Sequence, residues 1–267
     1  MAALKVLRHA MLRLLVLSLV AVAGVQFYFV ARIALMAVIA PESTAFERSE
    51  IYRITKTTGV LPWRQQWTPY AKISVNLQRA VIASEDGSFT EHDGLDLEAL
   101  EKAWEKNAIA QRRAQKIAEQ QAAQASRQGK KPAPAVAQSP TAKPVKIVGG
   151  STITQQLAKN LFLSGERTLL RKGEELVLTL LLETLLDKQR ILEIYLNSVE
   201  WGEGVFGAEA AAQHYFRKPA ARLSPYEAAR LAVMLPRPRY FETRPNSDYL
   251  ATRANAIVAR MGSVDLP

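Results

Sequence analysis

The sequence predicts a mainly α-helical protein with a membrane-spanning helix at its N-terminus. The first observation is an apolar, uncharged run over residues 14–31. The second is that apolar residues recur at helical spacing in several later segments. The third is that no segment alternates convincingly between apolar and polar residues, as a half-buried strand would. We therefore expect little sheet and no repeated strand–helix–strand unit.

The N-terminal apolar run extends from Leu14 to Ala31. As a helix it spans about 27 Å, close to the thickness of the hydrocarbon core of a bilayer. Basic residues precede the run, so the positive-inside rule places the N-terminus in the cytoplasm and the rest of the chain across the membrane. These residues are Lys5, Arg8 and Arg13.

A cleaved signal peptide is the alternative for this segment, because Ala21-Val22-Ala23 resembles a cleavage site. Apolar residues resume after Arg32 and continue to residue 40, which favours an uncleaved anchor. We expect residues 1–13 to form a cytoplasmic flank and residues 14–40 a transmembrane anchor with a juxtamembrane segment. Residues 41–267 then form the remaining domain.

Periodicity predicts five helices in that domain, whereas residues 41–69 have mixed polarity and no strong period. Asp96 is a plausible N-cap for the second helix. Residues 177–186 are apolar nearly all round, which predicts that this part of the fourth helix is buried inside the domain. The expected helices span residues 72–84, 95–107, 152–161, 171–197 and 225–235.

Residues 107–146 differ in composition from the rest of the chain. Ala, Gln, Lys, Arg and Pro dominate, there is no aromatic residue, and Glu119 is the only acid. We call residues 107–146 the insert. Its first half is compatible with a solvated helix. The second half cannot bury enough apolar area and is expected to be extended or disordered.

Composition excludes several functions. The chain has no cysteine and three histidines, which excludes thiol chemistry and nearly excludes a zinc site. A net charge of +10 is typical of proteins that bind nucleic acid, so a nucleic acid partner has to be considered. However, the excess lies before the anchor and in residues 107–146, and basic and acidic residues are equal in number elsewhere. We therefore expect no nucleic acid partner, and we expect the insert to face an anionic lipid or glycan surface.

Residues 85–94, with the sequence EDGSFTEHDG, follow an apolar helix. One interpretation is a capped turn, since acids and glycines are common in turns. The other is that Glu85 lies at the edge of a cleft and acts as a general base.

Two further polar segments each allow a structural and a functional interpretation. Residues 149–160, GGSTITQQLAKN, place glycines and hydroxyls at a helix start, which suits either a well-capped helix or an anion site. Residues 167–175, RTLLRKGEE, combine three cations with two acids. Arg171 and Glu175 are one helical turn apart, so they form either a surface pair or a desolvated carboxylate in a cationic site.

Together, the patterns EDxxFxxHxG, GGSTITQQxxKN and RKxxE resemble those of the peptidoglycan glycosyltransferase family. Further similarity in residues 188–197 and 223–236 extends the resemblance over about residues 51–245. The resemblance implies a two-lobed, lysozyme-like α domain with a small membrane-dipping lobe. The chain has no Ser-x-x-Lys followed by Lys-Thr-Gly, so it resembles the monofunctional form without a transpeptidase domain.

The implied activity is polymerisation of lipid II at the outer, periplasmic face of the bacterial inner membrane. The growing chain moves from undecaprenyl diphosphate to the GlcNAc 4-hydroxyl of lipid II, and a β-1,4 bond forms. The implied partners are lipid II, the growing glycan chain, membrane lipid and other cell-wall synthesis or division proteins. The alternatives are a lytic transglycosylase or muramidase, and an inactive membrane-anchored scaffold.

The resemblance also implies roles for individual residues. Glu85 matches the general base, and Glu175 matches a second essential acid. Glu175 either orients the cations or holds a divalent ion, Mg²⁺ or Mn²⁺, at the diphosphate; the first role is favoured because no dense acidic cluster accompanies it, and no other cofactor is expected. The cleft-shaping residues are Asp86, Phe89 and His92. The substrate-binding residues are Ser151, Thr152, Thr154, Gln155, Gln156, Lys159, Asn160, Arg167, Arg171 and Lys172. Tyr195 and Asn197 are expected to be architectural.

Overall fold

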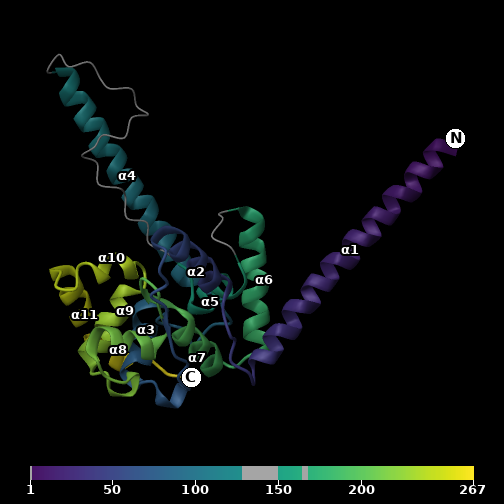
Figure 1. Cartoon of the computed structure of the whole chain (residues 1–267). Helices are drawn as coiled ribbons and strands as arrows, with labels where there is room; N and C mark the ends of the chain where they lie inside the picture. The colour runs from purple at the N-terminus through teal and green to yellow at the C-terminus, as the bar shows by residue number, and fades with distance from the viewer. Residues whose placement is uncertain (1, 128–149, 164–167) are drawn as a thin grey trace. The chain divides into compact units, whose positions relative to one another are not determined.

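The computed structural model describes residues 2–127, 150–163 and 168–267, and these are mainly α-helical (Figure 1). The mainly α fold class predicted from the sequence is therefore confirmed. The chain divides into two compact units, residues 1–94 with 152–267, and residues 95–151.

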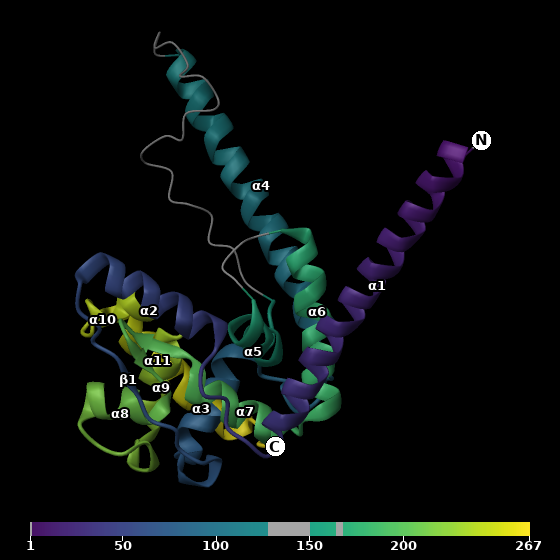
Figure 2. The same cartoon turned by 45° about the vertical axis from the view of Figure 1, so that its right-hand side comes forward.

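Helix α1 (Ala2–Met36) is long and apolar enough to cross a membrane. Most of its described side chains are exposed, as is typical of a helix that lipid surrounds. Its last turns differ, because Ile33 and Met36 are buried and the Phe29 ring packs edge-on against Phe162 at 5.3 Å. The same end of α1 contacts α6 (Figure 2). This helix fits a single-pass membrane anchor joined directly to the folded domain.

Helix α2 (Ala45–Thr58) lies in the segment where the sequence shows no strong period. It begins at a capping box, in which the Thr44 side chain accepts from the Glu47 backbone and the Glu47 side chain accepts from the Thr44 backbone. The pattern Thr-x-x-Glu is a sequence signature of a helix start. It could have predicted this helix where periodicity did not.

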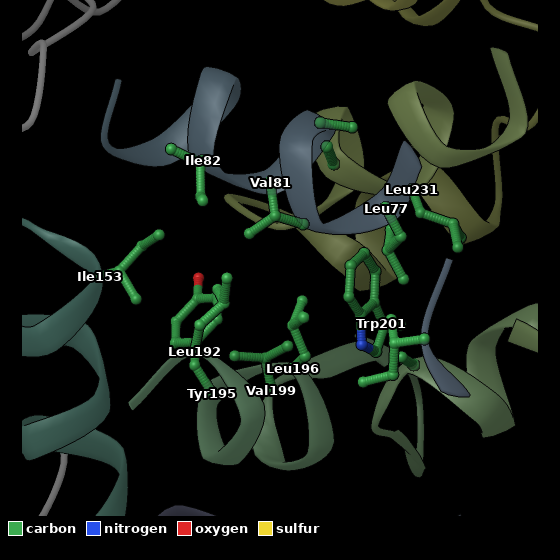
Figure 3. Close-up of a cluster of buried hydrophobic side chains, with 14 of the residues drawn as sticks. Leu77, Val81, Ile82, Ile153, Leu192, Tyr195, Leu196, Val199, Trp201 and Leu231 are labelled. Carbon is green, nitrogen blue, oxygen red and sulfur yellow. The ribbon is translucent and has the colours of Figure 1, made fainter. Parts of the chain in front are cut away.

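The core lies where helices from distant parts of the sequence converge. Side chains from α3, α5, α7 and α9 meet in one apolar cluster, into which Trp201 also inserts (Figure 3). Each of these helices begins at a Ser, Thr or Asp whose side chain accepts a backbone hydrogen bond, so a cap residue determines where each helix starts. This packing holds the C-terminal end of α3 in place. The helices are α3 (Val75–Glu85), α5 (Ile153–Phe162), α7 (Lys188–Ser198), α9 (Pro225–Met234) and α11 (Asp248–Arg260), which packs on α9.

Two predictions for residues 171–197 are wrong. The segment forms two helices, α6 (Leu169–Leu185) and α7, because Asp187 caps the second by accepting from the Arg190 backbone. In addition, α6 is not buried all round: Val177 is 43% exposed and Leu180 45%. Hydropathy alone could not reveal this, since a helix face that meets lipid has the same composition as one inside a core.

A small sheet and short helices complete the first unit. The strands pair in the order β1-β3-β2, with β1–β3 parallel and β2–β3 antiparallel. Gly204 has φ +70° and its α-carbon approaches Pro62 so closely that a Cβ would lie 2.3 Å from the carbonyl oxygen. Only glycine fits this turn. The elements are β1 (Arg64–Gln65), β2 (Glu200–Gly202), β3 (Val205–Phe206), α8 (Ala208–Phe216), α10 (Pro238–Glu242) and 3-10 turns at Tyr70–Lys72, Ala220–Arg222 and Met261–Ser263.

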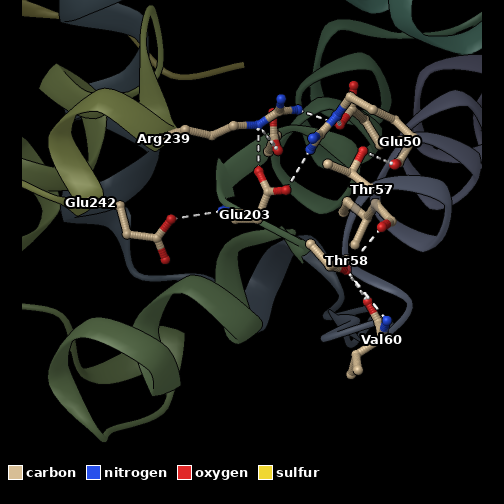
Figure 4. A network of polar contacts seen from close by, with 10 residues as sticks. Glu50, Thr57, Thr58, Val60, Glu203, Arg239 and Glu242 are labelled. Atoms are coloured by element: carbon tan, nitrogen blue, oxygen red, sulfur yellow. Dashed lines mark hydrogen bonds and ion pairs between the residues drawn. The ribbon is translucent and has the colours of Figure 1, made fainter.

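An ion-pair network ties α2 to β2 and α10 (Figure 4). Arg239 pairs with Glu50 and, at 2.8 Å, with Glu200. Arg53 pairs with Glu50 at 2.7 Å and with Glu203 at 2.6 Å. Several carboxylates share two guanidinium groups, so the charges are compensated within the network.

The second unit contains α4 (Leu97–Arg127). The Asp96 side chain accepts from the Ala99 backbone at 2.7 Å, which confirms the predicted N-cap. The helix continues beyond residue 107 to Arg127, so the first half of the insert is helical as expected. The second half, from residue 128, lies outside the described residues.

Candidate active site

Glu85 is the last residue of α3, and its carboxylate is half-buried. Gln156 on α5 donates to Oε2 through Nε2 at 3.1 Å, and Ser84 donates to Oε1 at 3.4 Å. Burial raises the pKa of Glu85 above its ordinary value, although the hydrogen bonds from Gln156 and Ser84 oppose the shift. A carboxylate whose pKa is raised toward neutrality is a better general base at physiological pH.

Tyr195 on α7 fixes the orientation of Gln156. Its hydroxyl donates to Gln156 Oε1 at 3.0 Å, so the amide presents its NH₂ group to Glu85. Tyr195 is fully buried. This burial is the main reason why its pKa lies well above the ordinary value, and the nearby negative charges of Glu85 and Asp86 add to the shift. The hydroxyl therefore keeps its proton. No sequence pattern indicates this contact, because it depends on how α7 packs against α5.

Asp86 is buried and connects the loop after α3 to the start of α5. Its Oδ2 accepts from the Ile153 backbone at 2.9 Å, and its Oδ1 lies 2.8 Å from His92 Nε2. The Gly94 backbone donates to His92 Nδ1 at 3.1 Å. Because a backbone N–H can only donate, the ring proton sits on Nε2 and is donated to Asp86. Both residues thus hold the loop that follows Glu85.

Lys188 supports the same loop from α7. Its Nζ donates to the His92 carbonyl at 2.5 Å, pairs with Glu183 at 2.9 Å and lies 4.6 Å from the centre of the buried Phe89 ring. Sequence reasoning missed this contribution, because Lys188 and the loop are far apart in the chain. Phe89 is fully buried, as a residue that shapes the loop from within would be.

The first turn of α5 is mostly used in internal contacts. Thr152 donates to the Gly94 carbonyl at 2.7 Å and forms a capping box with Gln155. Thr154 is fully buried and donates to Glu183 at 2.5 Å. These three side chains lock α5 against neighbouring segments. Ser151 and Lys159 are exposed, and Asn160 is half-buried.

Glu175 on α6 is buried and forms ion pairs with two basic side chains. Lys172 Nζ lies within ion-pair distance of Oε1, and an Arg171 terminal nitrogen lies 3.4 Å from Oε2. The buried Nε of Arg171 has no hydrogen-bond partner among the residues that the structure describes. Helix α6 packs against α5, which carries Lys159, so the predicted cations are on adjacent helices. Arg167 lies outside the described residues.

A small group of potential metal ligands includes Asp86 and His92. Asp86 already accepts from a backbone N–H and from His92, which favours a structural role for the pair. Both oxygens of Glu175 face cations, an arrangement that suits holding those cations better than ligating a metal.

The arrangement combines a half-buried carboxylate able to take a proton with cations organised around a buried acid. Together these two features suit an enzyme that moves a group from an anionic leaving group to a hydroxyl.

Comparison with known proteins narrows this class. The family model described as transglycosylase matches residues 53–133 and 129–262. The chain is 50% identical over 242 residues to the biosynthetic peptidoglycan transglycosylase of Burkholderia thailandensis, covering 91% of this chain and 82% of that one. It is 46% identical over 264 residues to the protein of that name from Herminiimonas arsenicoxydans, covering 99% and 100%. The chain therefore belongs to the transglycosylase family, which confirms the predicted resemblance.

Proposed function

We propose that this chain polymerises lipid II into uncross-linked glycan strands for the bacterial cell wall. The observation that carries the proposal is the half-buried Glu85, oriented by Gln156 and Tyr195, in a chain that belongs to a family of glycosyltransferases. The relatives named biosynthetic peptidoglycan transglycosylases support glycan polymerisation as the reaction.

Glu85 serves as the general base. A sugar hydroxyl is a poor nucleophile at neutral pH, so the carboxylate takes the proton of the GlcNAc 4-hydroxyl as that oxygen attacks C1 of the donor sugar. The O4–C1 bond forms, the bond from C1 to the diphosphate oxygen breaks, and the anomeric centre inverts to give a β-1,4 linkage.

The leaving undecaprenyl diphosphate needs charge neutralisation more than protonation. Charged groups supply it best when they are already oriented. Glu175 orients Arg171 and Lys172 for this purpose, and a divalent ion at the diphosphate is the alternative role for this acid. Thr152, Thr154 and Gln155 hold α5 in position, while the direct contacts to substrate come from Gln156 and from the more accessible groups. Those groups are Ser151, Lys159, Asn160, Arg171 and Lys172; Arg167, which lies outside the described residues, stays a predicted contact.

The membrane supplies the substrate. The apolar α1 anchors the chain, with residues 1–13 in the cytoplasm and residues 41–267 forming the glycosyltransferase domain at the outer face of the inner membrane. Leu170, Val177 and Leu180 expose apolar side chains on α6, the helix that carries the cation pair. A polyprenyl diphosphate suits this pattern, because its tail lies in lipid and its charges lie at the surface. For the insert at residues 107–146, of which residues 128–146 lie outside the described part of the chain, an anionic leaflet or glycan surface stays the predicted partner.

The test is to incubate the purified full-length chain, in liposomes, with labelled lipid II and separately with isolated cell-wall sacculi. Polymer formed from lipid II is expected. Shortened glycan from sacculi without polymer would instead identify a lytic transglycosylase or muramidase, and inactivity on both substrates would identify a scaffold. Repeating the assay with a chelator and with added Mg²⁺ or Mn²⁺ tests the divalent ion.

A further inference from the structure

The C-terminal part of the chain carries positive charge that the proposed reaction does not use. Residues 217–260 contain nine basic and three acidic residues, a formal net charge of +6. Residues 14–106 and 147–267 together have equal numbers of basic and acidic residues, so this charge is a local excess within the sequence. Such a surface attracts anions.

Three of these arginines are arranged around aromatic rings. The Arg244 guanidinium lies 4.3 Å from the centre of the Tyr240 ring, and the Arg237 guanidinium lies 5.8 Å from the same ring. Arg230 lies 5.9 Å from the Phe216 ring and donates to the carbonyl of residue 245, next to Arg244. We call Arg230, Arg237, Arg244 and Tyr240 the arginine platform.

The platform differs from the ion-pair network of Figure 4, which uses Arg239 of α10, the helix that also carries Tyr240. Arg239 is paired with several glutamates, whereas none of the three platform arginines has a carboxylate within ion-pair distance among residues 2–127, 150–163 and 168–267. The side chains of Arg230 and Arg244 donate hydrogen bonds to carbonyl and hydroxyl oxygens instead. Contact with a ring helps to hold a guanidinium in place, and the N–H groups that have no acceptor within the chain can bind a carboxylate.

The apolar side chains nearby indicate which anion this surface suits. The exposed large apolar residues between 217 and 267 are Tyr226, Tyr240 and Tyr249, with no exposed leucine, isoleucine, valine, methionine, phenylalanine or tryptophan in that range. Exposed aliphatic residues lie on α1 and α6 instead. A surface that inserts into the acyl region of a membrane needs such residues. Tyrosine with arginine suits a hydrated, carboxylate-bearing polymer better.

The platform belongs to the same packed unit as Glu85. Helix α9, which carries Arg230, packs against α3, and Ser84 donates to the α9 carbonyl of Ala232 at 3.5 Å. Ser84 precedes the proposed base directly. The helix that carries Arg230 therefore packs directly against the helix that ends at Glu85.

We propose that the arginine platform binds the glycan strand product through the carboxylates of its peptide stems. This inference rests on the proposed function, because lipid II brings a peptide stem into every unit of the strand. The platform keeps the strand on the enzyme between additions without touching the reacting atoms.

The test measures binding of the full-length chain, in detergent, to separately prepared uncross-linked strands. R237Q/R244Q should weaken binding to strands with intact stems at least fivefold. K56Q/K72Q removes the same charge from exposed lysines elsewhere and should change binding less than twofold. After enzymatic removal of the stems, the wild type and R237Q/R244Q should bind equally. Unchanged binding of intact strands by R237Q/R244Q would overturn the proposal.

Two further measurements distinguish strand binding from lipid binding and from a general effect of charge. R237Q/R244Q should partition onto anionic phospholipid vesicles as the wild type does; a loss there with unchanged strand binding would identify lipid as the ligand and overturn the proposal. R237K/R244K keeps the charge but loses the planar fork, and should bind strands with intermediate affinity. Thermal unfolding checks that the variants fold.

Activity distinguishes this proposal from the proposed function. R237Q/R244Q should keep the wild-type initial rate on lipid II and release shorter strands. A wild type that makes no polymer would refute the proposed function, whereas binding to the prepared strands would still test the platform.

Discussion

Glu85 and Glu175 are two carboxylates with opposite surroundings. Glu85 accepts hydrogen bonds from a neutral amide and a hydroxyl. Among the described residues, no cation lies within ion-pair distance of its carboxylate. Glu175 is buried between Arg171 and Lys172. Only an unpaired carboxylate with a raised pKa is suited to accept a proton, whereas one held by two cations is suited to position them. The comparison shows how neighbours assign different roles to the same side chain.

The largest effect should come from removing the proposed base. E85Q keeps the shape but cannot take a proton, so the polymerisation rate should fall about 10³-fold. E91Q makes the same change in an exposed residue of the loop that follows α3 and should leave the rate within twofold. An E85Q rate within tenfold of the wild type would show that another group is the base.

Removing the second acid should have a smaller effect on the rate. E175Q leaves Arg171 and Lys172 without their shared carboxylate, and misplaced cations should lower kcat about 10²-fold. The neighbouring E174Q changes an exposed residue and serves as the control. If E175Q unfolded at a lower temperature but kept full activity, Glu175 would be purely structural.

Releasing Gln156 should lower the rate by roughly fivefold. Y195F leaves the Gln156 carbonyl oxygen without its donor, so the amide can turn away from Glu85. A pH profile distinguishes this from a packing defect. Losing the Gln156 hydrogen bond raises the pKa of Glu85, so the acidic limb of the profile should move to higher pH.

The smallest effect concerns stability. Burial raises the pKa of Glu85 in the folded chain, so its contribution is most favourable below pH 4.5 and is lost as pH rises through the folded pKa. E85Q should therefore raise the Tm at pH 7, and the gain should shrink toward pH 4. A gain independent of pH would show that charge burial is not its cause.

Local patterns predicted much of the fold around these carboxylates. Thr152 before α5 and Asp96 before α4 are cap residues where hydrogen-bonding chemistry decides the helix start. The exposed face of α6 escaped prediction, because an apolar run has the same composition whether it meets lipid or a core. The break at Asp187 was missed although the polar residues 187–190 and the cap at Asp187 mark it. Lys188 and Tyr195 act on the site only through tertiary contacts. Residues that touch across long separations leave no local pattern.

The central claim is that Glu85 accepts the proton and that burial tunes its pKa. The most direct test is the pH dependence of kcat/KM for polymerisation of lipid II, measured for the wild type and Q156L. The acidic limb of the wild type should lie above 4.5, the ordinary value for glutamate, and Q156L should move it higher, because this change removes a hydrogen bond that lowers the pKa. A limb at or below 4.5 that Q156L leaves in place would contradict the assignment.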